Sequence, residues 1–463
     1  MTLEHFIGIF ATLFSIVALS IYSGKATKNK KGANSWVVAG IIMGTLVGGS
    51  STVGTAQLAY QYGMSAWWFT LGSGVACLVL ALFFAKPLYK SNHKTLIEFI
   101  ISEYGEKNGL IASILSSLGS FINIISQLIA ATAIIAVAAP QLPIVPALLI
   151  SAGFMVLYVV FGGTKGSGWV GIFKMILLYV AMIASGILVL VLSNGVQGFA
   201  NLVSLIDNPE NIRFQSLFAR GAGEDFGACM SLILGVITTQ SYAQAIFAAT
   251  DHKTAVKGAV FSSFLIPPVG VGGILVGLYM RSTHPNIVPK TALTLFVTEN
   301  MPPLLGGIVL GALFIAVVGT GAGLALGIST VIRRDVVPAL RCKTTKVLSE
   351  SKSEKMWIML ILIVACLLSM GPLGDTILKF AFMSMGLRGA TIFIPLCCAI
   401  WCPGKINKFY AGAAIILGPV SVMIFELLGF LTFDPLFVGV FISAVIMFLG
   451  YLSNRVNKNP LNT

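Results

Sequence analysis

Glycine and hydroxyl residues are unusually dense in the segment GTLVGGSSTVGTAQLAYQYG, residues 44–63. Its first glycines are Gly44, Gly48, Gly49 and Gly54, and the hydroxyl residues among them are Ser50, Ser51, Thr52 and Thr55. Glycine costs a helix about 1 kcal/mol relative to alanine, and close packing of helices through small residues does not require so many. We therefore expect an unwound helix, whose freed carbonyls can coordinate a cation and whose half-helix ends can face a substrate.

The segment FIAVVGTGAGLALGISTVIRRD, residues 314–335, combines glycines and hydroxyls in the same way. Thr320 lies near the middle of this apolar run and can supply an oxygen ligand to a cation. The alternative is a hydroxyl bonded back to its own helix, which is common in membranes.

A cluster of amide and hydroxyl side chains occupies residues 238–244, where Gln240 and Gln244 lie four positions apart on one helical face. Glutamines in an apolar environment need hydrogen-bond partners. The two amides either hold neighbouring helices together or face a substrate. We favour the substrate-facing role, since the cluster is larger than one packing contact uses.

Arg388 lies in the apolar run FMSMGLRGATIF, between Gly386 and Gly389. A buried arginine is costly and by default marks a functional site. No acid in the same run is placed to neutralise it, so an anionic substrate and the carbonyls of a glycine break are both open as partners. Glu426 is the clear acid within the apolar runs, and this scarcity of acids favours a metal cation over a proton as a transported ion.

The elements that position these residues are apolar helices. Of the 463 residues 57% are hydrophobic and 10% are charged, against about 25% charged in soluble proteins. Runs of roughly 20 apolar residues recur along the chain, and in lipid such continuous runs form helices. We predict an all-α membrane protein with about thirteen transmembrane helices, near 4–23, 36–60, 65–86, 109–138, 143–162, 168–193, 226–248, 257–280, 303–329, 356–371, 375–401, 407–430 and 433–453. An amphipathic stretch at 93–105 is expected on the membrane surface.

The distribution of basic residues orients this bundle. The segments on one side hold 22 lysines and arginines and those on the other side hold four. Basic residues favour the cytoplasmic side. The bias predicts a multi-pass protein of the cell membrane with its N-terminus outside and its C-terminus in the cytoplasm.

Several other functions are disfavoured by the sequence. The net charge of +13 is spread over short connections rather than one face, so no nucleic-acid partner is expected. The seven cysteines show no disulfide framework. Cys397, Cys398 and Cys402 lack a nearby fourth ligand for zinc. Walker motifs and catalytic His or acid clusters are absent, so the chain is not expected to be an ATP-driven pump or an enzyme.

The chain resembles the sodium:solute symporter family over nearly its whole length. The resemblance rests on the glycine-rich second span with its YG ending, on the pair Gln240 and Gln244 before AATDHKTAVKG, and on three longer segments. These segments are YVVFGGTKGSGWVGIF, AVVGTGAGLALGISTVIRRD and IPLCCAIWCPGKINKFYAGAAIILG.

The resemblance implies a single transporter domain with a LeuT-type fold. An extra first helix, 4–23, would precede two inverted five-helix repeats, 36–193 and 226–401, and helices at 407–453 would follow. Sodium would be the coupling ion, held by carbonyls of the second span and by the ninth span. Matching the motifs puts these sodium ligands at Gly49, Thr52, Ala316, Gly319 and Thr320.

The resemblance also implies substrate contacts from the second, seventh and eleventh spans. These contacts map to Ser51, Thr55, Gln57, Gln240, Gln244 and Arg388. The partners expected are sodium, membrane lipid and a small organic solute, anionic if it pairs with Arg388, and we expect a monomer. The implied function is sodium-coupled symport by alternating access.

Three positions depart from the family pattern. Gly319 replaces the first of two adjacent hydroxyl residues, Gly171 replaces a frequent aspartate, and Ala245 replaces a frequent arginine. These departures keep two alternatives open. One is a proton-coupled or uncoupled solute carrier, and the other is a membrane sensor that has kept the fold without transport.

Overall fold

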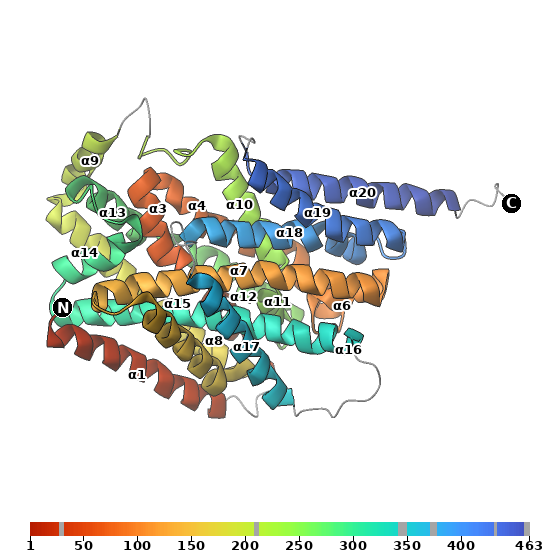
Figure 1. The fold of residues 1–463 in the computed structure, drawn as a ribbon, viewed down its shortest axis with the longest axis horizontal. Helices are drawn as coiled ribbons and strands as arrows, with labels where there is room; N and C mark the ends of the chain where they lie inside the picture. The colour runs from red at the N-terminus through yellow and green to blue at the C-terminus, as the bar shows by residue number, and fades with distance from the viewer. Residues whose placement is uncertain (27–31, 208–212, 341–349, 371–376, 430–432, 458–463) are drawn as a thin grey trace.

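The computed structural model describes the chain except residues 27–31, 208–212, 341–349, 371–376, 430–432 and 458–463. The described part is built from helices, and its β-structure is one isolated bridge between Ala33 and Ala249. The predicted all-α class is confirmed. The N-terminus and the end of α20 lie at opposite ends of the bundle (Figure 1).

Each of the thirteen predicted spans corresponds to helix. Unbroken spans are α1 (Leu3–Ala26), α7 (Glu106–Ala138), α15 (Pro303–Val331), α17 (Glu350–Ser369), α18 (Ile377–Trp401), α19 (Lys408–Leu428) and α20 (Leu436–Asn457). Other spans are composite, and two of them contain a short π-helical segment, labelled η. These two are α2 (Ser35–Leu46) with η1 (Ser50–Gly54) and α3 (Thr55–Tyr62), and α4 (Trp68–Val79) with η3 (Leu80–Phe84) and α5 (Ala85–Lys90). The others are α10 (Ala222–Ile237) with α11 (Gln240–Phe247), and α12 (His252–Leu265) with α13 (Pro267–Thr283).

The fifth and sixth predicted spans differ from expectation in one respect. They form a single 49-residue helix, α8 (Ile144–Leu192), without the loop expected at about residues 163–167. That stretch contains glycines but no proline. Glycine weakens a helix without removing a backbone donor, whereas proline removes one.

Short helices cover the two ends of the bundle. At the N-terminal end lie α9 (Gly195–Ile206) and α14 (Ala292–Asn300), and at the other end lie α6 (Leu96–Tyr104) and α16 (Val337–Leu340) (Figure 1). The helix α6 begins where Thr95 accepts a hydrogen bond from the Glu98 amide at 3.1 Å, a typical N-cap. It matches the amphipathic stretch predicted at 93–105.

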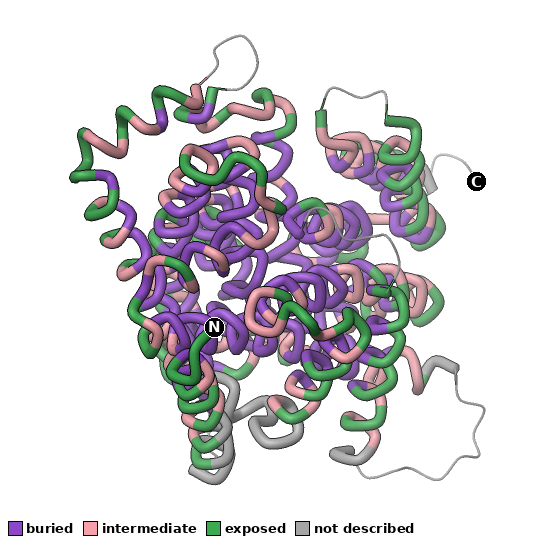
Figure 2. Tube along the Cα trace, turned by 60° about the vertical axis from the view of Figure 1, so that its left-hand side comes forward, coloured by how far each residue is buried: buried purple, intermediate pink, exposed green. Residues whose placement is uncertain are grey.

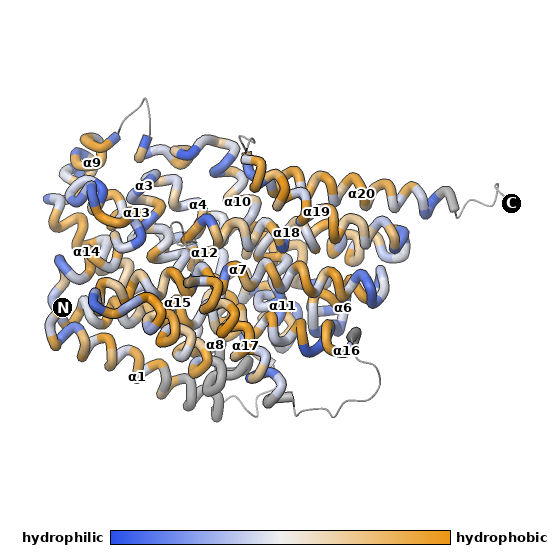
Figure 3. Tube along the Cα trace, in the orientation of Figure 1, coloured by the Kyte–Doolittle hydropathy of each residue, from blue (hydrophilic) through white to orange (hydrophobic). Residues whose placement is uncertain are grey.

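Burial separates a central helix from a periphery. In α15, 89% of an 18-residue apolar stretch is buried inside the protein, whereas the corresponding share in α20 is 28%. Buried residues gather in the interior and exposed ones on the outer helices (Figure 2). Apolar residues also line the outward-facing turns of α19 and α20 (Figure 3). An apolar exterior around a close-packed centre is what a lipid-facing bundle requires, because lipid tails solvate apolar side chains.

Candidate functional site

The second span is broken where the sequence predicted. Helix α2 ends at Leu46, and Val47 takes an extended conformation with φ −90° and ψ 104°. The Gly48 amide then donates to Ser51 Oγ at 2.9 Å, instead of continuing the ladder to the Gly44 carbonyl. The break therefore leaves the Gly44 carbonyl available to a partner outside its own helix.

Two glycines make the break possible because other spans approach their backbone. A Cβ at Gly48 would overlap Thr320 Oγ1 of α15, and a Cβ at Gly49 would overlap the side chain of Ala130 in α7. Residues with side chains would push α15 and α7 away from the break.

Gln127 of α7 holds the second half of this span. Its Oε1 accepts a hydrogen bond from the Gly49 amide at 2.9 Å, and its Nε2 donates to Ser50 Oγ at 3.1 Å and to Asn123 Oδ1 at 3.2 Å. Gln127 was not among the residues predicted from the sequence. The signal was present, because a glutamine inside an apolar span needs a partner.

A lysine occupies the space between the break and α15. Lys174 of α8 is 1% exposed. Its Nζ donates to the Gly44 carbonyl at 2.6 Å and to Thr320 Oγ1 at 3.0 Å. Thr320 Oγ1 in turn donates to the Val47 carbonyl at 3.2 Å. Nζ therefore contacts one oxygen from each of the two spans, and the Thr320 hydroxyl connects it to a second carbonyl of the broken span.

The predicted sodium ligands are only partly brought together. Thr320 lies against the broken span as expected, but its carbonyl partner is that of Val47. The Gly49 carbonyl accepts from the Gly54 amide at 2.7 Å, and the Thr52 carbonyl accepts from the Thr55 amide. Ala316 and Gly319 lie in the buried interior on α15. As a sodium-ligand set these five residues stay a prediction.

Position 171, where the family resemblance implies an aspartate, has no room for a side chain. A Cβ at Gly171 would overlap the Gly40 carbonyl of α2, so α8 packs directly on α2 at this point. Lys174 follows three residues later, against Gly44. Sequence reasoning missed Lys174, although a lone lysine in the apolar run at 168–193 marks a candidate site by the same argument as Arg388.

The seventh span is broken as well. Helices α10 and α11 meet at Thr238 and Thr239 with a bend of 48°. Thr239 lies at the bend, and its hydroxyl donates to the Gly235 carbonyl. It accepts a hydrogen bond from Arg388 Nη1 at 2.6 Å. The predicted residues Arg388 and Gln240 both lie near this break.

Arg388 is fully buried, and protein atoms take its N–H groups. Nε donates to the Ser384 carbonyl, Nη1 to Thr239 and to Ser120 Oγ at 3.4 Å, and Nη2 to Ser384 Oγ and to Met385 Sδ. A guanidinium has five donors, and these are five bonds. Among the described residues no carboxylate forms an ion pair with Arg388. Arg388 therefore connects α18, α7 and the break in the seventh span.

Gln240 contacts the helix at the membrane surface. Its Oε1 accepts from the Leu96 amide at 2.9 Å and its Nε2 donates to the Lys94 carbonyl at 3.1 Å, so it anchors the first turn of α6. Gln244, one turn further along α11, is half-buried. The two glutamines therefore lie on one helix, α11, and the Gln240 amide is used to hold α6 rather than to face a pocket filled by solute.

The remaining predicted substrate contacts are buried within the second span. Ser51 accepts from Gly48, Thr55 Oγ1 donates to the Ser50 carbonyl at 3.2 Å, and Gln57 Oε1 accepts from the Ile377 amide at 3.2 Å. The structure does not bring these three side chains into one pocket with Gln240.

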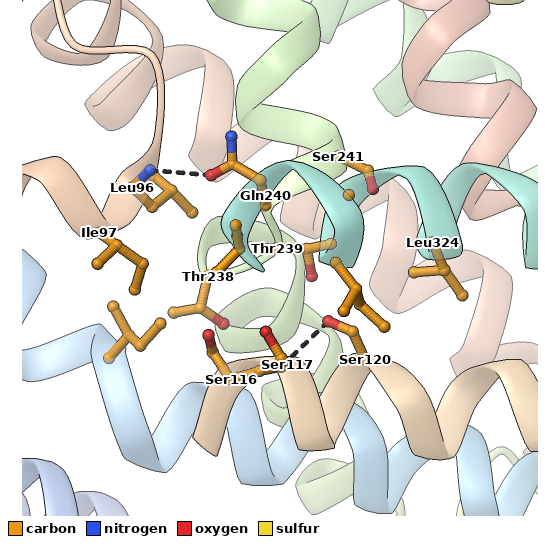
Figure 4. Close-up of a pocket in the computed structure, with 14 residues that line it drawn as sticks. Leu96, Ile97, Ser116, Ser117, Ser120, Thr238, Thr239, Gln240, Ser241 and Leu324 are labelled. Carbon is orange, nitrogen blue, oxygen red and sulfur yellow. Dashed lines mark hydrogen bonds between the residues drawn. The ribbon is translucent and has the colours of Figure 1, made fainter. Parts of the chain in front are cut away.

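A narrow polar pocket opens beside the second break. Hydroxyl groups of α7 and of the α10–α11 bend face one another across it, with Leu96 and Ile97 of α6 at its rim (Figure 4). Its hydroxyl residues are Ser116, Ser117, Ser120, Thr238, Thr239 and Ser241. Ser120 and Thr239 also accept from Arg388, so the guanidinium lies directly behind the pocket wall.

A buried ion pair lies at the other end of the bundle. Arg220 contacts Asp225 at 2.6 Å, and Asp225 is 0% exposed. Ser65 donates to Asp225 Oδ1 at 2.6 Å, and the Arg220 guanidinium lies 5.7 Å from the ring centre of Phe382. This cluster ties α10, the turn after α3 and α18 together. Both residues fall at the edge of a predicted span, where sequence reasoning treated them as loop residues.

Comparison with known proteins places the chain in a family. Residues 30–418 match the model of the sodium:solute symporter family. An uncharacterized symporter, YwcA, of Bacillus subtilis (strain 168) is 30% identical over 39% of this chain, and that match covers 37% of the relative's length. The high affinity choline transporter 1 of Homo sapiens is 22% identical over 90% of this chain and 75% of that protein.

Solved structures show the same fold. A Na⁺-coupled sialic acid symporter in a substrate-bound outward-open state matches with a TM-score of 0.79 at 16% identity, covering 98% of both chains. Mhp1, a nucleobase-cation-symport-1 family transporter, matches in a closed conformation with a TM-score of 0.62 at 13% identity, covering 94% of this chain and 96% of Mhp1. The predicted LeuT-type fold is confirmed, and the chain belongs to the sodium:solute symporter family.

Proposed function

We propose that the protein is a secondary transporter that carries a small organic solute across the cell membrane by alternating access, driven by a sodium gradient. The observation that carries this proposal is the pair of broken spans, α2–α3 and α10–α11. Side chains from other spans hold both breaks: Gln127 and Lys174 hold the first, and Arg388 holds the second. Half-helices joined by such contacts can reorient without exposing backbone to lipid.

Sodium as the coupling ion is supported by membership of the family. The proposed orientation, with the N-terminus outside, is supported by the excess of basic residues near α6, α16 and α20. The hydroxyl-lined pocket beside the second break lies toward that end of the bundle.

The pocket beside the second break has a volume of about 10 Å³, room for about one water, so a solute would enter only after the helices around it move apart. Its walls present hydroxyls that both donate and accept hydrogen bonds. The charge of Arg388 lies just behind Ser120 and Thr239, so the pocket is a favourable environment for a carboxylate. We therefore include small carboxylates among the solutes to be tested first.

The test has two stages. Thermal unfolding of the purified protein is first measured against classes of solute, with sodium and with potassium, since a ligand that binds the folded state raises the unfolding temperature. Uptake of a stabilising solute is then followed in proteoliposomes with an inward sodium gradient. Uptake that needs the gradient is expected. Equal uptake in potassium would contradict sodium coupling while leaving solute transport in place.

A sodium-independent carrier is the second candidate. It is favoured by Lys174, whose ammonium lies on Thr320, the side chain that the family resemblance assigns to sodium. The same proteoliposome experiment separates the two candidates, because a sodium-independent carrier takes up solute equally in either salt.

A further inference from the structure

We propose that the Lys174 ammonium is a built-in cation, which takes the position between the broken second span and Thr320 that a sodium ion would otherwise occupy. Sodium is then excluded from this position in the wild-type protein. The inference goes beyond the proposed function, because it concerns one position and holds whether or not solute uptake is driven by sodium.

The oxygens around Lys174 are the kinds that bind a small cation. The Gly44 carbonyl lies in the last turn of α2, and Gly48 no longer donates to it. Carbonyls at a helix C-terminus carry partial negative charge and stabilise cations. The Thr320 hydroxyl is the second oxygen, at 3.0 Å. Freed carbonyls and hydroxyls of this type coordinate sodium in transporters with broken helices.

Lys174 is held by neutral oxygens. Its side chain is 1% exposed, and among the described residues none with a carboxylate forms an ion pair with it. A sodium ion added to the same oxygens would have to share an enclosed space with a second positive charge. At the roughly 3–4 Å separation this implies, like charges repel strongly in a low-dielectric interior.

Two neighbouring positions lack what a sodium ion would use. At Gly319 there is no side chain, although a Cβ there would meet only ordinary contacts at 3.4 Å from the Tyr158 ring. At Gly171 a side chain has no room against the Gly40 carbonyl. An oxygen ligand at 319 is therefore absent although space exists for one, whereas an acid at 171 is excluded by packing.

The second break supplies an independent observation. Arg388 contacts Thr239 at the bend of the seventh span and Ser120 of α7. Lys174 contacts Gly44 at the break of the second span and Thr320 of α15. In both cases a buried cation joins a broken span to a hydroxyl of a third helix. At both broken spans, a basic side chain thus occupies the space beside the break.

The experiment measures sodium binding to the full-length purified protein. Binding of radioactive sodium and thermal unfolding in sodium chloride against potassium chloride are recorded for the wild type, Lys174→Met, Thr320→Val and the double variant. Methionine retains much of the lysine stem but removes the charge. We expect Lys174→Met to gain sodium-specific binding and stabilisation, and the double variant to lose both.

The wild type provides the complementary result. If it binds sodium at another position, that binding is expected to be the same in Thr320→Val. Sodium binding by the wild type that disappears in Thr320→Val would overturn the inference, because sodium would then reach Thr320 with Lys174 present. Lys174→Met that folds but gains no sodium binding would overturn it too.

Two further measures keep the test decisive. If Lys174→Met fails to fold, the comparison of wild type with Thr320→Val still shows whether sodium reaches Thr320. Failure of the proposed function looks different, because it would be the absence of solute uptake in proteoliposomes. Sodium-driven uptake that persists in Thr320→Val would support both proposals, with the coupling ion bound elsewhere.

Discussion

The two broken spans use the same arrangement with different cations. Under the expected repeats, 36–193 and 226–401, each break lies in the first helix of a repeat, and each cation comes from the fifth helix. The hydroxyl partner comes from the third helix of the opposite repeat: Thr320 for Lys174, and Ser120 for Arg388. This equivalence is not visible in the sequence, because Lys174 and Arg388 lie in segments without obvious similarity.

The difference between the cations is instructive. The lysine is a compact point charge and makes two hydrogen bonds to oxygens, in the manner of a metal ion. The arginine spreads five hydrogen bonds over α18, α7 and the bend, which suits a rigid brace. We infer that the single charge of Lys174 at the first break can be replaced by another small cation. The five directed hydrogen bonds of Arg388 at the second break cannot be replaced in this way.

Loss of the Arg388 hydrogen bonds is expected to reduce stability the most. Arg388→Gln removes most of the bonds to Thr239, Ser120 and Ser384 and leaves these buried oxygens without the donors that Arg388 provides, so we expect a loss of about 3 kcal/mol in stability. Thermal unfolding measures it. Lys379→Gln is the control, since Lys379 lies on the same helix with a side chain 69% exposed. Unchanged stability together with loss of solute-induced stabilisation would assign Arg388 to the substrate instead.

Adding a methyl group at the first break is expected to cause the second-largest loss of stability. Gly48→Ala places a methyl group where Thr320 Oγ1 lies, which forces α2 and α15 apart. Overpacking of this kind costs about 1–3 kcal/mol. The control is Gly386→Ala, where the nearest atom to an added Cβ is 3.6 Å away. Comparable unfolding temperatures for the two variants would contradict the close approach of Thr320 to the break.

Removing the amide that holds the first break is expected to follow. Gln127→Leu keeps a similar volume but leaves the Gly49 amide without its acceptor, at a cost of about 2 kcal/mol. Thr132→Val serves as the control, because the Thr132 hydroxyl donates to the Ile129 carbonyl of its own helix. Hydrogen exchange at residues 48–52 should speed up in the first variant alone. Protection equal to that of the wild type would show that Gln127 does not hold the break.

The helices of this molecule were predictable from the sequence, and the contacts at the breaks were not. Apolar runs gave thirteen spans, because a bilayer fixes the length of a helix. The glycines at 44, 48 and 49 marked the first break, since close helix packing alone does not require glycine at that density. The partner of Thr320 depended on a shift of a few residues between two helices, and no local pattern encodes such a shift. Lys174 was detectable as a charge, but its partners were not.

The smallest effect is expected where the second break meets the surface helix. Gln240→Leu removes the acceptor of the Leu96 amide and the donor to the Lys94 carbonyl, both near the membrane surface. Water can replace part of these bonds, so we expect a loss of about 1 kcal/mol, confined to the attachment of α6. Limited proteolysis within residues 91–105 should become faster. In Gln197→Leu, at the other end of the bundle, it should not. If cleavage stays slow in Gln240→Leu, the apolar face of α6 on α7 is enough to hold α6, and Gln240 does not couple the second break to the surface helix.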